Sequence, residues 1–310
     1  MKAIMYHYVR PYSPDFPNFK NLDFEGFEKQ LDYFEKEFGF VTKKDFLQAI
    51  TSGVPTSGVV LTFDDGFKDH FDYVLPVLKR RNLWGIFYII TGVYTTKDLL
   101  DVHKIHLLLG KTPPKELYNT LQHLISDDML PFRHLVSFKK ATYMLQKNDD
   151  YTNLIKRTLN YYINNEFRSI VIKNLMREFF IENTPELFEK FYLSEKEIRI
   201  LKNEGMVIGS HSVNHYVMSK LSLKKQKVEI DNSFSFLEKT LGIFEPKTFC
   251  FPYGGFHTFT EETIIFLKEK GVDFSFNVEP RNISKFDLAH NKQILPRYDC
   301  NQFPFGSCLN

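Results

Sequence analysis

The chain has 310 residues and a mass of 36.6 kDa, enough to bury the core of one barrel-sized domain or of one domain that carries an insertion. Its 40 basic and 38 acidic residues give a formal charge of +2, so nothing in the charge favours a nucleic-acid partner or a membrane surface. No apolar run approaches the length of a transmembrane helix. Aromatic residues make up 16% of the chain, and we expect most of them in the core.

Cysteine usage and the start of the chain predict the compartment. The three cysteines, at positions 250, 300 and 308, are odd in number and show no Cys-x-x-Cys spacing, which favours reduced thiols over a disulfide scaffold. The segment from Met1 to His7 lacks the apolar core and the cleavage site of a signal peptide. We therefore expect a cytoplasmic protein, while a chain trimmed of its leader would show the same start.

The first part of the chain alternates between strand and helix patterns. Short apolar runs that end at glycine or polar residues predict strands, and apolar residues three and four apart predict helices. In chain order we expect a strand Lys2–Tyr8, a helix Phe24–Phe38, a short strand Phe40–Val41, a helix Lys44–Ile50, a strand that ends at Asp64, a helix Phe67–Arg80 and a strand Trp84–Ile90.

The middle of the chain, from about Lys97 to Phe191, has helical patterns and no strand patterns. The expected helices are Leu99–Leu109, Pro114–Ile125 and, in one or more pieces, Leu154–Phe180. An insertion that replaces a strand-to-helix connection of a barrel is expected at the rim that bears the active site. It could shape a substrate cleft, form a dimer contact, dock a partner or membrane, or be structural elaboration. His103 and His106 are expected to be packing or surface residues and not metal ligands.

The alternation resumes after the middle. The expected elements are a helix Glu195–Asn203, a strand Val207–Ser210, a helix Ser222–Leu241, a strand Thr248–Phe251, a helix Glu261–Lys270, a strand Asp273–Asn277 and a last strand Ile294–Arg297. About eight strand candidates that alternate with helices predict an α/β protein with a parallel (β/α) barrel.

Two adjacent carboxylates, Asp64 and Asp65, stand where an apolar strand ends at Gly66. Two like charges in such a place are costly without a cation or a shared proton, which favours a metal or an acid/base role. A polar turn is the other interpretation, because Asp pairs also occur at Asp127 and at Asp149 in polar surroundings.

A histidine pair, His211 and His215, follows another short apolar run closed by Gly209. Two imidazoles four positions apart can converge on one ion, and histidine with carboxylate is a common zinc environment. With 10 histidines in the chain, this spacing alone is weak support. Its position is stronger support, because strand ends carry the chemistry of α/β barrels and open sheets.

The strand expected at Thr248–Phe251 leads into the turn Pro252–Gly255. Glycines allow backbone N–H groups to approach a ligand, and Tyr253 adds a flat ring with a polar end. Taken alone, this segment is an ordinary turn.

The three elements in this order resemble the polysaccharide deacetylase family, also called the NodB-homology domain or carbohydrate esterase family four. That family carries Thr-Phe-Asp-Asp-Gly, then His-Ser/Thr-x-x-His, then Arg-x-Pro-Tyr, and its metal-dependent members remove N- or O-acetyl groups from sugars. The first two motifs are matched completely, at Thr62–Gly66 and His211–His215. The resemblance implies a distorted (β/α) barrel of seven or eight strands from residues 1–96 and 192–310, interrupted by the helical insertion 97–191.

The resemblance also implies roles for single residues. Asp64 would be the general base, and the backbone N–H of Tyr253 would help to hold the oxyanion. The implied ligands of a divalent metal, usually zinc, are Asp65, His211 and His215. The implied substrate contacts are Pro252, Tyr253 and Gly254.

Two positions depart from the family pattern. Cys250 stands where the family arginine would hold the catalytic aspartate, and Arg297 stands where the family has the histidine that serves as catalytic acid. We hypothesise that the two changes are linked, since both segments could end on one face. The missing acid makes His7, at the end of the first strand, our candidate proton donor, with a structural histidine as the alternative.

The chain opens with Met5-Tyr6-His7-Tyr8-Val9 and closes with Leu295-Pro296-Arg297, which resembles the branch that acts in exopolysaccharide and poly-N-acetylglucosamine assembly. The predicted function is a metal-dependent hydrolase that removes an acetyl group from an amino sugar. The substrate would be a glycan or a sugar-linked intermediate of cell-surface polysaccharide or lipopolysaccharide metabolism. A sugar deformylase and a non-catalytic metal- and glycan-binding domain are the alternatives. An oligomeric partner could bind through the insertion.

Overall fold

The computed structural model describes residues 1–143, 148–179 and 185–307. The chain forms two compact units, each assembled from separate stretches of sequence. The first unit consists of Met1–Pro11, Asn21–Thr96 and the residues from Glu189 onward. The second unit consists of Tyr12–Lys20 and Lys97–Phe188.

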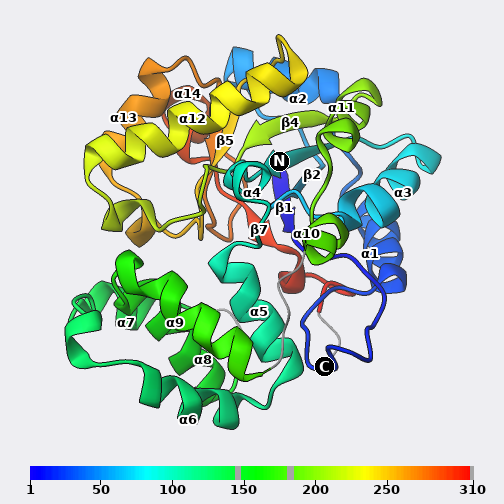
Figure 1. Ribbon diagram of the computed structural model, residues 1–310. Coiled ribbons are helices and arrows are strands. Elements are labelled where there is room, and N and C mark those ends of the chain that lie inside the picture. Colours follow the sequence, from blue (N-terminus) through cyan, green and yellow to red (C-terminus); the bar gives the residue numbers. More distant parts are fainter. Residues whose placement is uncertain (144–147, 180–184, 308–310) are drawn as a thin grey trace. The chain divides into compact units, whose positions relative to one another are not determined.

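The first unit is built on a seven-stranded, all-parallel sheet (Figure 1). The strands are β1 (Lys2–Tyr6), β2 (Val59–Phe63), β3 (Gly85–Ile89), β4 (Val207–Ser210), β5 (Thr248–Cys250), β6 (Phe274–Phe276) and β7 (Tyr298–Asp299). Their order across the sheet is β6-β5-β4-β3-β2-β1-β7, and each neighbouring pair is parallel. Seven curled parallel strands with surrounding helices confirm the predicted distorted (β/α) barrel.

The last strand differs from its prediction at Ile294–Arg297. Lys292–Ile294 form a 3₁₀ turn, and the strand β7 begins only after Arg297. Leu295 still exchanges backbone hydrogen bonds with the β6 side of the sheet, through Ser275 O and Asn277 N. Pro296, which has no N–H, cannot continue such a ladder. The segment therefore pairs with β6 at Leu295 and then, as β7, with β1. In this way it joins the two edges of the sheet.

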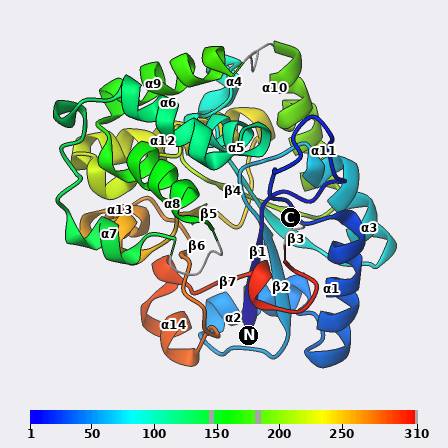
Figure 2. The same cartoon turned by 90° about the horizontal axis from the view of Figure 1, so that it is seen from below.

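Helices cover the outside of this sheet (Figure 2). They are α1 (Phe24–Glu37), α2 (Lys43–Ser52), α3 (Leu75–Arg80), α4 (Gly92–Thr96), α11 (Glu195–Asn203), α12 (Leu223–Leu241), α13 (Glu261–Glu269) and α14 (Lys285–His290), with the C-terminal part of α10 (Pro185–Phe191). The helix predicted from Phe67 begins instead at His70, with one π-helical turn before α3. The strand predicted at Phe40–Val41 is a single bridge between Phe40 and Val59.

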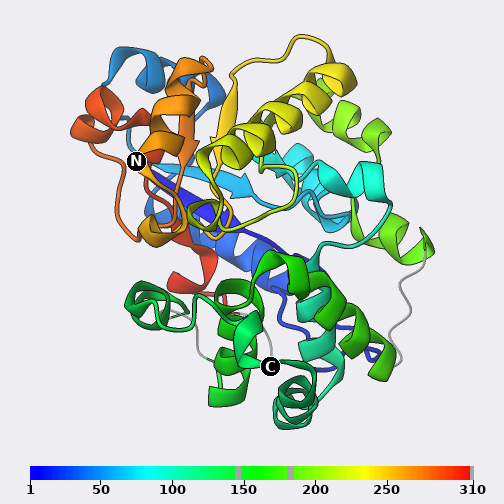
Figure 3. The ribbon, with the colours of Figure 1, turned by 60° about the vertical axis from the view of Figure 1, so that its left-hand side comes forward.

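The barrel interior is filled by side chains from alternate strand positions. This cluster includes Ala3, Val60, Ile86, Tyr88, Val207, Cys250, Phe274, Phe276 and Leu295. All residues of β2 and β3 are buried, because helices cover the face that does not point inward. Helix α12 lies beside β4 and α13, and Figure 3 shows this helix from the side, in yellow-green to yellow.

The second unit is helical. It contains α5 (Asp101–Lys111), α6 (Pro114–Leu124), α7 (Val136–Ala141), α8 (Asp150–Arg157), a π-helical turn (Thr158–Tyr162) and α9 (Asn165–Glu178). The pattern predicted as Leu154–Phe180 is thus two helices joined by the π-helical turn, and Phe180 lies outside the described residues. His103 is fully buried in α5. Within the described parts of the chain, no helix is both long and apolar enough to span a membrane.

Candidate metal centre and active site

The side chains predicted to carry the chemistry follow the carboxyl ends of parallel strands of one sheet. Asp64 and Asp65 follow β2, His211 follows β4, and His7 follows β1. In a parallel barrel these ends lie at one rim. The fold thus brings together residues that are more than 140 positions apart in the chain.

Asp65, His211 and His215 form a buried group of three potential ligands. Asp65 Oδ1 lies 3.4 Å from His211 Nε2 and 3.6 Å from His215 Nε2, and the three donor atoms lie within 4.8 Å of one another. Ligands about 2.0–2.2 Å from a tetrahedral zinc ion are separated by roughly 3.3–3.6 Å. The two distances to Asp65 therefore fit a small divalent ion.

The tautomer of His211 also fits this group. Its Nδ1 lies 2.8 Å from the backbone oxygen of Cys250, and a carbonyl oxygen can only accept, so Nδ1 carries the proton. In neutral imidazole the other nitrogen, Nε2, then has a lone pair directed toward Asp65. A backbone acceptor on the second nitrogen is the usual arrangement for a histidine that binds metal.

Left-handed backbone conformations are concentrated at this rim. Among the described non-glycine residues, eight have positive φ, and four of them are Asp65 at 77°, Ser212 at 65°, His215 at 53° and Tyr253 at 63°. Such conformations are costly for residues with a Cβ and persist where the surrounding structure enforces them. The rim is therefore held in a geometry that local preference alone would not select.

Asp64 is paired with the arginine that the sequence left unexplained. Arg297 Nη1 donates to Asp64 Oδ1 and Nη2 donates to Oδ2, both at 2.8 Å, and the arginine is fully buried. Nη2 also lies 2.9 Å from Cys250 Sγ, and Nη1 lies 2.9 Å from Thr62 Oγ1. The small thiol at position 250 thus leaves room for a guanidinium supplied from another segment. The hypothesis that positions 250 and 297 are linked agrees with this contact.

The pairing controls the charge of Asp64. Burial raises the pKa of this carboxyl, but the charge of Arg297 and the hydrogen bonds from its guanidinium outweigh it, so the pKa falls to about 2. A carboxylate offers about four lone pairs, of which Arg297 takes two and the Cys250 thiol, at 3.5 Å, a third. Asp64 is therefore ionised at neutral pH and retains the capacity to accept one further hydrogen bond.

His7 is half-buried at the end of β1, where its charge contributes to the lowered pKa of Asp64. His70 fixes its backbone: His70 Nε2 donates to His7 O at 2.8 Å. Burial lowers the pKa of His70 to about 4, which keeps His70 neutral. His7 thus has the position expected of a proton donor, and its role stays a prediction.

The third motif segment adjoins the histidines. The Tyr253 ring lies 4.8 Å from the His215 ring, centroid to centroid. Gly254 has φ of 71°, and its carbonyl accepts a hydrogen bond from Val278 N at 2.9 Å. A Cβ at Gly254 would collide with the Val278 side chain, so only glycine fits here. The substrate contacts expected of Pro252, Tyr253 and Gly254 stay a prediction.

Reasoning from sequence missed two polar residues that support this site. Thr62, inside β2, accepts from Arg297, and Glu229, inside α12, accepts from the loop between the two histidines. Glu229 could have been noticed from the sequence, because it falls on the helix face that also carries apolar residues. The buried stripe of α12 includes Gln226, Glu229, Ile230, Ser233, Phe234 and Leu237.

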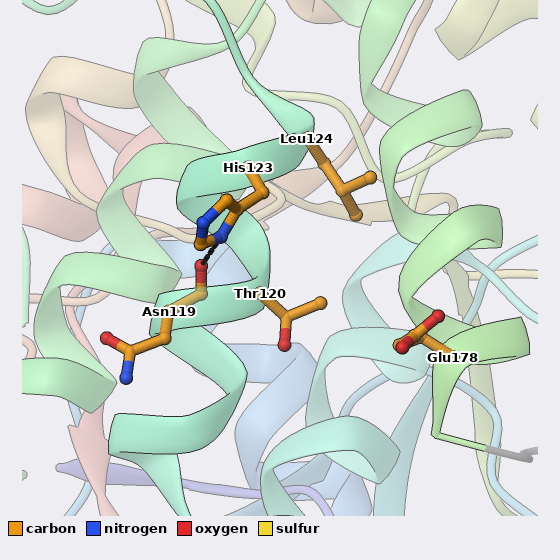
Figure 4. A pocket seen from close by; sticks show the side chains of 5 residues that line it. All are labelled: Asn119, Thr120, His123, Leu124 and Glu178. Atoms are coloured by element: carbon orange, nitrogen blue, oxygen red, sulfur yellow. Dashed lines mark hydrogen bonds between the residues drawn. The ribbon is translucent and has the colours of Figure 1, made fainter.

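The second unit has a surface depression of its own (Figure 4). Its lining residues, from α6 to the end of α9, are Asn119, Thr120, His123, Leu124 and Glu178. His123 Nδ1 donates to the backbone oxygen of Asn119, one helical turn earlier, at 2.7 Å. None of the predicted site residues lines it.

Comparison with known proteins supports the resemblance seen in the motifs. Residues 173–275, which include both histidines and the Pro252–Gly254 turn, match the family model described as polysaccharide deacetylase. This match confirms the resemblance to the polysaccharide deacetylases. A search of curated proteins finds no match.

Solved structures of polysaccharide deacetylases and related proteins share the fold. The deacetylase PplD of Streptococcus pyogenes, in complex with acetate, is 16% identical, with 96% of this chain and 91% of that chain covered and a TM-score of 0.58. IcaB from Ammonifex degensii is 18% identical, with 89% and 82% covered and a TM-score of 0.50. A de-N-acetylase from Aggregatibacter actinomycetemcomitans is 14% identical, with 96% and 93% covered and a TM-score of 0.53.

Proposed function

We propose that this polysaccharide deacetylase-like protein is a metal-dependent hydrolase that removes an acetyl group from an amino sugar. The proposal rests on one observation above all. A buried group of three potential metal ligands, Asp65, His211 and His215, adjoins an aspartate that a buried arginine keeps ionised. The donor set of two imidazoles and one carboxylate suits zinc, with a position left for water or substrate.

Asp64 accepts a proton from water in this proposal. Arg297 orients its carboxylate with two hydrogen bonds and leaves one acceptor position open. A carboxylate with a pKa of about 2 is a weak base on its own. Asp65, His211 and His215 would hold a divalent ion, which would supply the Lewis acidity that lowers the pKa of water and polarises the acetyl carbonyl.

The remaining groups handle the substrate. The backbone N–H of Tyr253 donates to the carbonyl oxygen as negative charge develops on it. His7 gives a proton to the leaving nitrogen, so that acetate and a free amine are the products. Arginine keeps its proton at neutral pH, which removes Arg297 as the donor. The de-N-acetylase among the structural neighbours supports an N-acetyl substrate.

Mass spectrometry of candidate sugars incubated with the zinc-loaded protein tests the function. We expect loss of an acetyl group from N-acetylated glycans and release of acetate, with turnover lower by roughly two to four orders of magnitude in protein carrying Asp64→Asn. Release of formate from an N-formylated sugar instead would make the protein a deformylase. Binding of sugar and zinc with no release of either acid would make it a non-catalytic binding domain.

A further inference from the structure

The loop that carries the two histidines is held from the side by helix α12. Glu229 Oε2 accepts from the backbone N–H groups of Val213, at 3.1 Å, and Asn214, at 2.7 Å. Glu229 Oε1 accepts from the side-chain amide of Asn214 at 2.6 Å. One turn later on the same helix, Ser233 Oγ lies 2.5 Å from Ser210 Oγ, at the end of β4. Two residues of one helix face thus anchor both the strand end and the loop.

Every backbone N–H from residue 211 to residue 215 has an acceptor, and Glu229 supplies two of them. A short loop has few ways to satisfy these groups once they are buried. The acceptors, in order, are Ile89 O at 2.9 Å, Ser210 Oγ at 3.3 Å, Glu229 Oε2 at 3.1 Å and again at 2.7 Å, and Ser212 Oγ at 3.1 Å.

The opposite side of the loop is fixed by backbone. Thr91 N donates to Ser212 O at 3.1 Å, and Gly92 N donates to Val213 O at 2.9 Å. A Cβ at Gly92 would lie 2.7 Å from Val213 O, so glycine is needed for this approach. The loop is therefore clamped between the segment after β3 and the carboxylate of Glu229.

The Glu229 carboxylate is buried and does not face solvent. Glu229 is 6% exposed, and burial of an ionised carboxylate is costly unless hydrogen bonds replace its hydration. Three N–H donors from two consecutive residues offset part of that cost, and burial still raises the pKa of Glu229. The cost of burying Glu229 and the left-handed backbone of Ser212 and His215 both indicate that the surrounding structure enforces one conformation of this loop.

We propose that Glu229 is a positioning residue for the metal centre: it holds the 213–214 backbone so that the imidazoles of His211 and His215 converge with Asp65. This inference rests on the proposed function, because it assumes that the three residues bind a divalent ion. Glu229 touches neither metal nor substrate and acts through the loop. Residues that orient metal ligands in this way typically contribute 10- to 100-fold to metal affinity.

Competition between the protein and a chelator for zinc measures the effect directly. We expect Glu229→Ala to weaken zinc binding by about 10- to 100-fold. Glu238→Ala is the matched control, since Glu238 is an exposed glutamate of the same helix, paired with Lys247 on the surface. It should leave the affinity unchanged. Hydrogen exchange of the metal-free protein should show faster exchange at Val213 and Asn214 in Glu229→Ala.

Two conservative variants separate position from charge and serve if Glu229→Ala does not fold. Glu229→Gln keeps an oxygen for the backbone N–H groups, and the Asn214 amide can turn to accept from the new NH₂ group, so zinc affinity should stay within a few-fold of wild type. Glu229→Asp keeps the charge but withdraws the acceptor by roughly one C–C bond, about 1.5 Å, so affinity should fall as in the alanine variant.

The outcomes distinguish the inference from the proposed function. Failure of the wild-type protein to bind zinc would contradict the proposed function itself. Tight zinc binding by wild type and equally tight binding by Glu229→Ala would overturn only the positioning role. So would wild-type affinity in Glu229→Asp together with lost affinity in Glu229→Gln, because that result assigns the effect to charge.

Discussion

Arg297 and Asp64 form a fully buried pair linked by two parallel hydrogen bonds of 2.8 Å, although they are separated by 233 positions in the chain. The guanidinium enters from the segment that joins the two edges of the sheet, and it lies 5.8 Å from the Tyr88 ring centroid and 5.5 Å from that of Phe276. Arg297 thus supplies a guanidinium to Asp64, whereas the resemblance led us to expect one from position 250. Because Arg297 belongs to the segment that closes the barrel, closure of the barrel also brings in the cation that keeps Asp64, the candidate base, ionised.

Removal of this arginine should affect both stability and turnover. Arg297→Ala leaves a buried carboxylate without its partner, which should lower the free energy of unfolding by about 3–5 kcal/mol in urea titrations. Turnover should collapse while zinc content is retained. Arg297→Lys should rescue little, because lysine cannot form the two-pronged pair. Arg80→Ala, at an exposed surface arginine, is the control. Unchanged turnover in Arg297→Ala would remove Arg297 from the site.

Asp64 should separate metal binding from chemistry. Asp64→Asn is isosteric and lies outside the proposed ligand set, so zinc content measured by elemental analysis should match wild type. Turnover should fall by roughly two to four orders of magnitude, as expected for a lost general base. Near-normal activity would make Asp64 a structural neighbour of the metal.

His7 should matter most when the leaving group is poor. His7→Ala should bind zinc normally, lose most activity on an N-acetyl sugar and lose much less on an activated aryl acetate, whose leaving group needs no proton. Rates on the two substrates, measured side by side, check this. Equal losses on both would point to damaged binding, and no loss on either would exclude His7 as the donor.

A partly buried ion pair between Arg281 and Asp287, at the start of α14, should make stability depend on pH. Burial raises the pKa of Asp287, but hydrogen bonds from Arg281, at 2.6 and 2.9 Å, and from Ser284 outweigh it, so the pKa is lowered. A group whose pKa is lower in the folded state stabilises the protein above its unfolded pKa, near 3.9, and that contribution is lost as pH falls through the folded pKa.

The measurement is the urea midpoint of wild type and Asp287→Asn between pH 7 and pH 2. The variant should be less stable at pH 7, and the difference should shrink below about pH 4. Glu238→Gln, at an exposed site, should show no such trend. A difference that is constant with pH would mean that the charge of Asp287 does not carry the effect.

Sequence reasoning located the strand ends that carry Asp64, Asp65 and His211, because short apolar runs closed by polar residues or glycine are a strong local signal. It misplaced the last strand, since Leu295 and Pro296 look strand-like while backbone pairing with β1 begins only at Tyr298. Strand pairing across 290 positions has no local signature.

Side-chain contacts across the fold were harder to foresee. The contact between the Arg297 guanidinium and Cys250 depends on how far the Arg297 side chain extends into the barrel. No spacing in the sequence encodes this depth. Glu229 looks like an ordinary helix glutamate until the loop after β4 is placed against it. Only its position on the buried stripe of α12 set it apart.

Acetate release as a function of bound zinc tests the central claim most directly. Protein freed of metal by a chelator is titrated with zinc, and acetate released from N-acetylglucosamine oligomers is measured at each step. Release should rise in proportion to zinc and level off at one equivalent per chain, and it should be absent in the His211→Ala and His215→Ala variants, which lose one of three ligands. Equal release from the metal-free protein, or full zinc occupancy in either histidine variant, would contradict the account.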